Sequence, residues 1–138
     1  MKIQEIAAIV ENDNEGVEVQ IYQRDEAPYL AADGSPCTIT VVGAESDRYK
    51  AAKRAQSRRL MKRARSGGRI TPEESEAEAV TLCAAAVVAW HGWEDAAGKD
   101  LPCTPENVRL VLAYDHIFEQ VQAGIMGHAA FFASKSDS

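Results

Sequence analysis

The side chains in this sequence that could carry catalysis or bind a metal are three histidines, three cysteines and scattered carboxylates. None of His91, His116 and His128 stands three or four residues from another histidine or a cysteine, the spacing that aligns two ligands on one helix face. Neighbouring carboxylates such as Asp115 and Glu119 lack a nucleophile, a metal-ligand pattern or a glycine-rich phosphate loop beside them. We therefore expect no catalytic residue, no metal site and no cofactor, and we predict that the protein is not an enzyme.

The cysteines and the apolar runs indicate the compartment. Cys37, Cys83 and Cys103 form neither a CxxC pair nor an even set, so we expect no disulfide scaffold and a reducing environment. We interpret each cysteine as a small buried core residue. Because no apolar run approaches the roughly 18 residues that cross a bilayer, a soluble protein without a membrane span is predicted.

A basic run is the strongest charge feature of the sequence. Ten of the fifteen Lys and Arg residues lie between residues 46 and 69, in a chain of formal net charge -6. The run predicts a helix that packs through a narrow stripe containing Tyr49 and Leu60. Its exposed basic face consists of Arg54, Arg58, Arg59, Lys62 and Arg63.

Two hypotheses explain this face. It could contact phosphates in a nucleic-acid-binding regulator that uses the basic helix 48–65. It could instead pair with the glutamates at 73–78, which follow a two-glycine turn, in a charge-matched helical hairpin. The sequence pI of about 5.1 favours the hairpin, so we do not expect nucleic acid as the partner and keep the regulator as an alternative.

Two apolar segments are candidates for binding a protein partner. Trp90 and Trp93 flank a His-Gly pair, and tryptophan is favoured at interface hot spots, although the same residues could simply cover the core at a helix end. The C-terminal segment carries a second apolar face. The predicted partner-binding residues are Trp90, Trp93, Ile117, Phe118, Val121, Ile125, Phe131 and Phe132.

The sequence patterns predict the elements that position these residues. Together these elements indicate an α+β fold, in which a small N-terminal antiparallel β-hairpin packs on a mainly helical domain of four to five helices. Residues 2–10 are expected to form a short helix, and 17–22 and 37–43 the two strands. Further helices are expected at 45–65, from Pro72 to near Gly92, at 105–113 and after Asp115, with Thr71, Thr104 and Asp115 as N-caps. We predict one domain over residues 1–138, with a helix and hairpin at 1–43, a helical part at 44–132 and a frayed polar tail at 133–138.

The order of these segments resembles the tail assembly chaperones of long-tailed (siphovirus-like) bacteriophages and prophages. The matching stretches are the hairpin ending ITVVG, then SDRYKAAKRAQSRR, RITPEESEAEAVTLCAAAVVAWHGWED and LPCTPENVRLVLAYDHIFEQVQAGI. The resemblance implies a non-enzymatic factor that binds and solubilises the tape measure protein and helps to recruit the tail tube protein during tail morphogenesis.

The resemblance also implies a location in the cytoplasm of the infected or lysogenic bacterial host, and absence from the mature virion. Self-association into a homo-oligomer is left open. The alternative within the same biology is another small phage structural protein, such as a head–tail connector or a tail completion factor.

Overall fold

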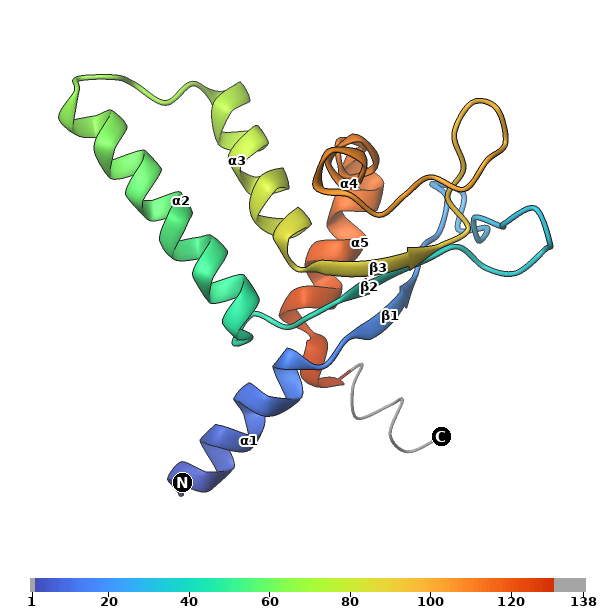
Figure 1. The fold of residues 1–138 in the computed structure, drawn as a ribbon, viewed down its shortest axis with the longest axis horizontal. Helices are drawn as coiled ribbons and strands as arrows, with labels where there is room; N and C mark the ends of the chain where they lie inside the picture. The colour runs from blue at the N-terminus through green and yellow to red at the C-terminus, as the bar shows by residue number, and fades with distance from the viewer. Residues whose placement is uncertain (1, 131–138) are drawn as a thin grey trace.

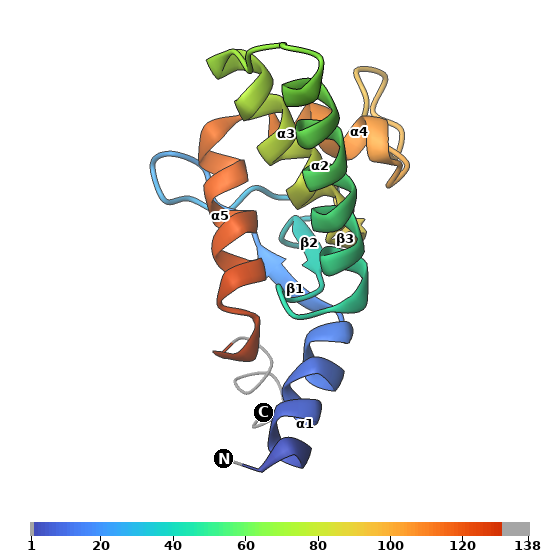
Figure 2. The ribbon, with the colours of Figure 1, turned by 90° about the vertical axis from the view of Figure 1, so that its left-hand side faces the viewer.

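The computed structural model describes residues 2–130 of the chain. Within that range the elements are α1 (Ile3–Asn14), β1 (Val17–Gln20), β2 (Thr38–Val41), α2 (Asp47–Arg65), α3 (Pro72–Ala85), β3 (Val87–His91), α4 (Pro105–Leu112) and α5 (Asp115–Met126). The predicted α+β fold is confirmed, with an antiparallel sheet at its centre (Figure 1). Helix α1 extends away from the rest of the molecule in both views (Figure 2).

The sheet has β2 as its central strand, and the predicted hairpin of β1 and β2 is confirmed. Alternation along the strands places Val19 of β1 and Ile39 and Val41 of β2 in the core. These side chains join one cluster with Val121 and Ile125 of α5, so α5 covers one face of the sheet. One part of the core therefore lies between the hairpin and α5, and the same cluster continues to residues of α2, α3 and α4.

The third strand corrects the prediction of one helix from Pro72 to near Gly92. Helix α3 ends at Ala85, and Val87–His91 pairs antiparallel with β2 instead. A continuous apolar run does not reveal whether it will be helix or strand, but β-branched and aromatic residues such as those of β3 fit a strand. The open edge of β2 decides the outcome, because β3 supplies hydrogen-bond partners for its backbone.

The charge-matched hairpin of α2 and α3 is confirmed. The Arg59 guanidinium lies 2.8 Å from the Glu78 carboxylate, and Arg63 forms an ion pair with Glu74 one turn further along. Thr71 caps α3 as predicted, since its hydroxyl accepts a hydrogen bond from the Glu74 N–H at 3.1 Å. These contacts join the basic end of α2 to the acidic start of α3.

Three predicted helix ends differ from the structure. Helix α1 continues past residue 10 to Asn14, because the Asp13 carboxylate accepts the Glu45 N–H at 2.7 Å and the Asp13 carbonyl accepts the Gly43 N–H at 2.7 Å. Helix α2 begins at Asp47 and not at Glu45, with Ser46 as its cap. Asp115 is the first residue of α5 and not its cap, a position that Tyr114 holds without a side-chain hydrogen bond.

Candidate functional site

A groove of about 550 Å³ opens between α3, α4 and α5. Its apolar lining comes from all three helices: Ala77, Ala79 and Val80 of α3, Leu112 and Ala113 at the end of α4, and Phe118 of α5. The alanines leave space because their methyl groups do not reach across to α4 and α5. The groove is therefore a consequence of the small residues in the middle of α3.

The rim of the groove is acidic. Glu73, Glu76 and Asp115 lie along it, and Arg109 is the cation that lines it. The Arg109 guanidinium lies 3.9 Å from Glu106, a residue of the same helix outside the groove. An apolar floor with a carboxylate rim suits an amphipathic helix whose apolar face is flanked by Lys or Arg.

The residues predicted from the last helix fall into three groups. Phe118 lines the groove and is half-buried. Ile117, Val121 and Ile125 have exposed fractions of 4%, 0% and 1%, so they form the core and a partner could reach them only if the core opened. Phe131 and Phe132 lie outside the described residues.

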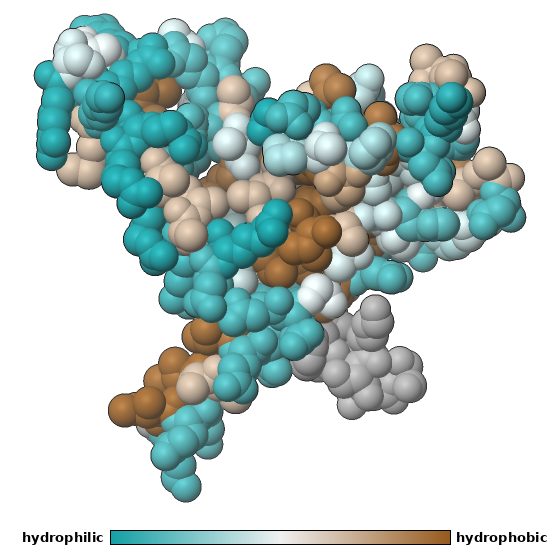
Figure 3. Space-filling model, in the orientation of Figure 1, coloured by the Kyte–Doolittle hydropathy of each residue, from teal (hydrophilic) through white to brown (hydrophobic). Residues whose placement is uncertain are grey.

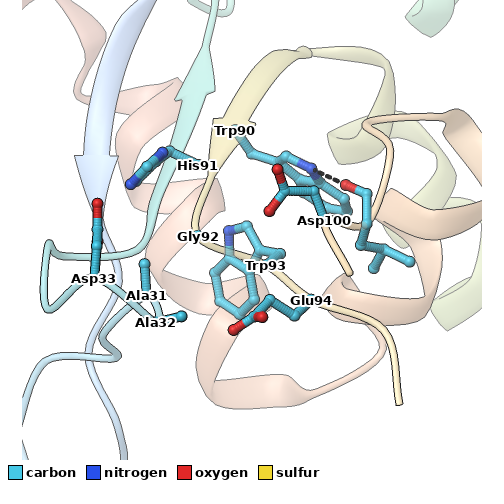
Figure 4. A pocket seen from close by; sticks show the side chains of 10 residues that line it. Ala31, Ala32, Asp33, Trp90, His91, Gly92, Trp93, Glu94 and Asp100 are labelled. Atoms are coloured by element: carbon cyan, nitrogen blue, oxygen red, sulfur yellow. Dashed lines mark hydrogen bonds between the residues drawn. The ribbon is translucent and has the colours of Figure 1, made fainter. Parts of the chain in front are cut away.

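The two tryptophans are half-buried and anchored by their indole N–H groups. Trp90 donates to the Leu101 carbonyl at 2.8 Å, and Trp93 donates to the Thr38 carbonyl at 3.1 Å. Their ring centroids are 6.2 Å apart, and both rings line a separate pocket of about 370 Å³ (Figure 4). Each tryptophan thus packs against the core and still presents part of its ring to a cavity. The position of each residue therefore fits both hypotheses, that it covers the core and that it binds a partner.

The predicted basic face of α2 is divided into two sides. Arg59 and Arg63 turn toward α3 and pair with its glutamates. Arg54, Arg58 and Lys62 are exposed and form no ion pair within the part of the chain that the structure describes. The hairpin therefore neutralises two of the five cations of this face.

Helix α1 carries an exposed apolar surface that the predicted partner-binding residues do not include. The exposed fractions of Ile3, Ile6 and Ile9 are 80%, 49% and 44%. Figure 3 shows this apolar surface on the protruding helix, apart from the body. The isoleucine spacing was the signal that could have identified it.

The groove lining from α3 and α4 was also missed, and no signal in the sequence would have identified it. Ala77 and Val80 belong to an unremarkable alanine-rich helix, and Leu112 reads as an ordinary core position. Their proximity depends on how three helices meet.

The titratable side chains are dispersed among different partners. His116 lies 2.7 Å from the Tyr29 hydroxyl, and His91 lies 2.7 Å from the Ser35 hydroxyl. Burial raises the pKa of Cys83 to about 11, which keeps the thiol protonated at neutral pH. Among residues 2–130, no three His, Cys, Asp or Glu side chains are placed to hold a metal ion together.

Cys103 is exposed, so the expectation that every cysteine is buried is wrong for this one, which lies in the irregular segment before α4. Within the described chain, no helix combines the length and the apolar character needed to cross a bilayer.

Comparison with known proteins identifies the family of this chain. The family described as the YdaY prophage protein matches residues 44–138, more than half of the sequence. The matched range contains α2 to α5 and β3, and so it includes the whole lining of the groove. No curated protein and no solved structure matches the chain. The chain belongs to the YdaY family of prophage proteins.

Proposed function

We propose that this prophage protein is a tail assembly chaperone. It binds a helical segment of the tape measure protein, keeps that protein soluble in the bacterial cytoplasm, and helps to recruit tail tube subunits. The protein acts without catalysis and leaves before the virion is complete.

The observation that carries the proposal is the groove between α3, α4 and α5. A long helical client exposes apolar stripes before it is enclosed, and a groove with an apolar floor accepts such a stripe in the helix-in-groove mode. The acidic rim of Glu73, Glu76 and Asp115 favours a client helix that carries Lys or Arg beside its apolar stripe. The exposed isoleucines of α1 offer a second apolar contact for the same client.

Co-expression tests the proposal directly. The tape measure protein of the same prophage is produced with and without this chain, and its soluble fraction and its co-purification are measured. We expect the wild-type chain to raise the soluble fraction severalfold. The substitution Ala77→Glu fills the groove with a charged side chain at an exposed position, so it should abolish that gain.

The matched control is Ala123→Glu, which introduces the same side chain at an exposed position of α5 that does not line the groove. This variant should behave like the wild type. A tape measure protein whose solubility does not change when the wild-type chain is present contradicts the proposal. Recovery of the chain in stoichiometric amounts from purified particles would instead favour a connector or a completion factor.

A nucleic-acid-binding regulator is the second candidate, because Arg54, Arg58 and Lys62 have no ion-pair partner among the described residues. Its test is a mobility-shift assay at about 100 mM salt, a concentration at which phosphate contacts still contribute to affinity. Charge removal at Arg58 and Lys62 should then weaken binding. Absence of any shift with the wild-type chain eliminates this candidate.

A further inference from the structure

The outer side of α2 carries cations that repel one another. Arg54, Arg58 and Lys62, which we call the outer stripe, follow each other at intervals of four residues. Side chains four apart on a helix are neighbours, and like charges at that spacing destabilise the helix. The ion pairs of α2 with α3 involve Arg59 and Arg63 and leave this stripe uncompensated.

The pocket beside the tryptophans has the opposite charge. We call it the indole pocket and define it by Trp90, Trp93, Glu94 and Asp100, which line a cavity of about 370 Å³. Glu94 and Asp100 face each other across an antiparallel bridge, where like charges are also destabilising. Neither carboxylate forms a hydrogen bond or an ion pair within the described part of the chain, and Figure 4 shows both beside the indole rings.

The combination of indole faces and carboxylates matches the chemistry of an arginine or lysine side chain. A guanidinium can stack on a tryptophan ring and donate hydrogen bonds to carboxylates at the same time. The hydrogen bonds from Trp90 to Leu101 and from Trp93 to Thr38 hold both rings in place before a ligand arrives. The pocket is thus prepared for a cation and contains no Lys or Arg in its lining.

The outer stripe and the indole pocket lie at opposite ends of the molecule. Helix α2 forms one end of the long axis, whereas the loops that carry the pocket form the other (Figure 1). The two surfaces therefore cannot meet within one chain. The charge distribution favours a meeting between chains, because residues 46–69 hold ten cations and one acid, while the rest of the sequence holds five cations and twenty acids.

We propose that the outer stripe of one copy binds the indole pocket of a second copy, so that the protein associates head to tail. The contact joins two different surfaces, and a heterologous contact of this kind can be repeated from copy to copy. This inference does not depend on the proposed chaperone activity, because no residue of the outer stripe or of the indole pocket lines the groove between α3, α4 and α5.

Complementary variants test the contact. The stripe variant carries Arg54→Glu and Arg58→Glu, and the pocket variant carries Glu94→Lys and Asp100→Lys. All four positions are exposed, so both variants should fold, which circular dichroism verifies. Sedimentation velocity at about 50 mM salt, where surface charges are weakly screened, measures association.

The wild-type chain should associate with increasing concentration, and salt should reverse the association. Each variant alone should remain monomeric. An equimolar mixture should associate again, because the intact stripe of the pocket variant meets the intact pocket of the stripe variant, and the two reversed surfaces are also opposite in charge. Both tryptophans of the chain lie in this pocket, so mixing should also change the tryptophan emission of the stripe variant.

Controls with the same charge changes elsewhere separate a specific contact from an effect of net charge. The control for the stripe variant is Lys2→Glu with Arg24→Glu, and the control for the pocket variant is Glu5→Lys with Glu11→Lys, all at exposed positions. Both controls should associate like the wild type. A wild-type chain that stays monomeric, a mixture that stays monomeric, or association that disappears after nuclease treatment would overturn the inference.

Discussion

At the scale of single residues, Gly124 shows how the absence of a side chain allows close packing in the core. Gly124 is buried in the middle of α5, where a glycine costs helix stability. A Cβ atom at this position would lie 2.6 Å from Cγ2 of Val19 on β1, closer than two non-bonded carbon atoms approach in proteins. The glycine therefore allows α5 to lie directly on the sheet, and its missing side chain is a packing requirement.

The substitution Gly124→Ala should destabilise the protein although alanine favours helices. We expect a loss of about 1–3 kcal/mol in the free energy of unfolding, the usual cost of overpacking a core. Urea denaturation followed by circular dichroism measures it. In a Val19→Ala background the same substitution should cost less, because the contacting methyl group is gone; an equal cost in both backgrounds would place the strain elsewhere.

At the scale of the elements, the α2–α3 hairpin is held by one packed stripe and by two ion pairs. Tyr49 is 5% exposed and packs in the core, whereas Arg59 and Glu78 lie near the surface. The hydrogen bond from Arg59 holds the pKa of Glu78 below its ordinary value of 4.5. Surface ion pairs stabilise weakly, so the hairpin depends on its packing more than on its charges.

A double-mutant cycle measures the Arg59–Glu78 contact. With Arg59→Gln and Glu78→Gln, we expect a coupling of roughly 0.2–1 kcal/mol at pH 7. Because the pKa of Glu78 is lowered in the folded state, its contribution is present above the unfolded value and is lost as the pH falls through the folded one. Arg58→Gln combined with Glu78→Gln is the control and should show no coupling, since Arg58 points away from α3. A coupling between Arg59 and Glu78 that persists when Glu78 is protonated would argue against an ionic contact.

At the scale of the whole molecule, one buried polar cluster joins segments far apart in the sequence. His128 is 1% exposed and lies beyond the end of α5, yet its Nε2–H donates to the Glu15 carbonyl at 2.6 Å. Its Nδ1 lies 3.4 Å from the Asp13 carboxylate, which also accepts the Glu45 N–H. The cluster thus connects the end of α1, the residues just before α2 and the residues just after α5. It fixes the end of α1 that is attached to the rest of the molecule.

Removal of His128 should loosen α1 before it unfolds the rest. In His128→Ala the Asp13 carboxylate and the Glu15 carbonyl lose a buried partner, at a cost of about 1–3 kcal/mol. Hydrogen exchange should show faster exchange in α1 and little change in α2 and α3. His91→Ala is the control, because His91 is exposed and bonds only Ser35 at the surface; equal effects of the two substitutions would refute the special role of the cluster.

Much of the architecture could be predicted from local patterns. Thr71 and Thr104 were predicted as N-caps because each precedes a Pro-Glu pair, and a threonine hydroxyl there can accept a hydrogen bond from the backbone N–H three residues on. Both caps are confirmed. Both strands were predicted from short runs of strand-forming residues, although each is shorter in the structure than the predicted 17–22 and 37–43. The pairing of the basic and acidic helices follows from charges that a two-glycine turn brings together. Each of these features depends on residues close together in the sequence.

By itself, therefore, the sequence determined the hairpin, the starts of α3 and α4 and the charge-matched helix pair, while only the tertiary structure decided the rest. Val87–His91 became a strand because the distant β2 had a free edge, and Gly124 became essential because Val19 lies against it. The groove exists because alanines of α3 meet α4 and α5, and the indole pocket exists because Glu94 and Asp100 are paired beside Trp90 and Trp93. The physical reason is the same in each case: these contacts join residues whose proximity no local preference specifies, and only packing of the whole chain brings them together.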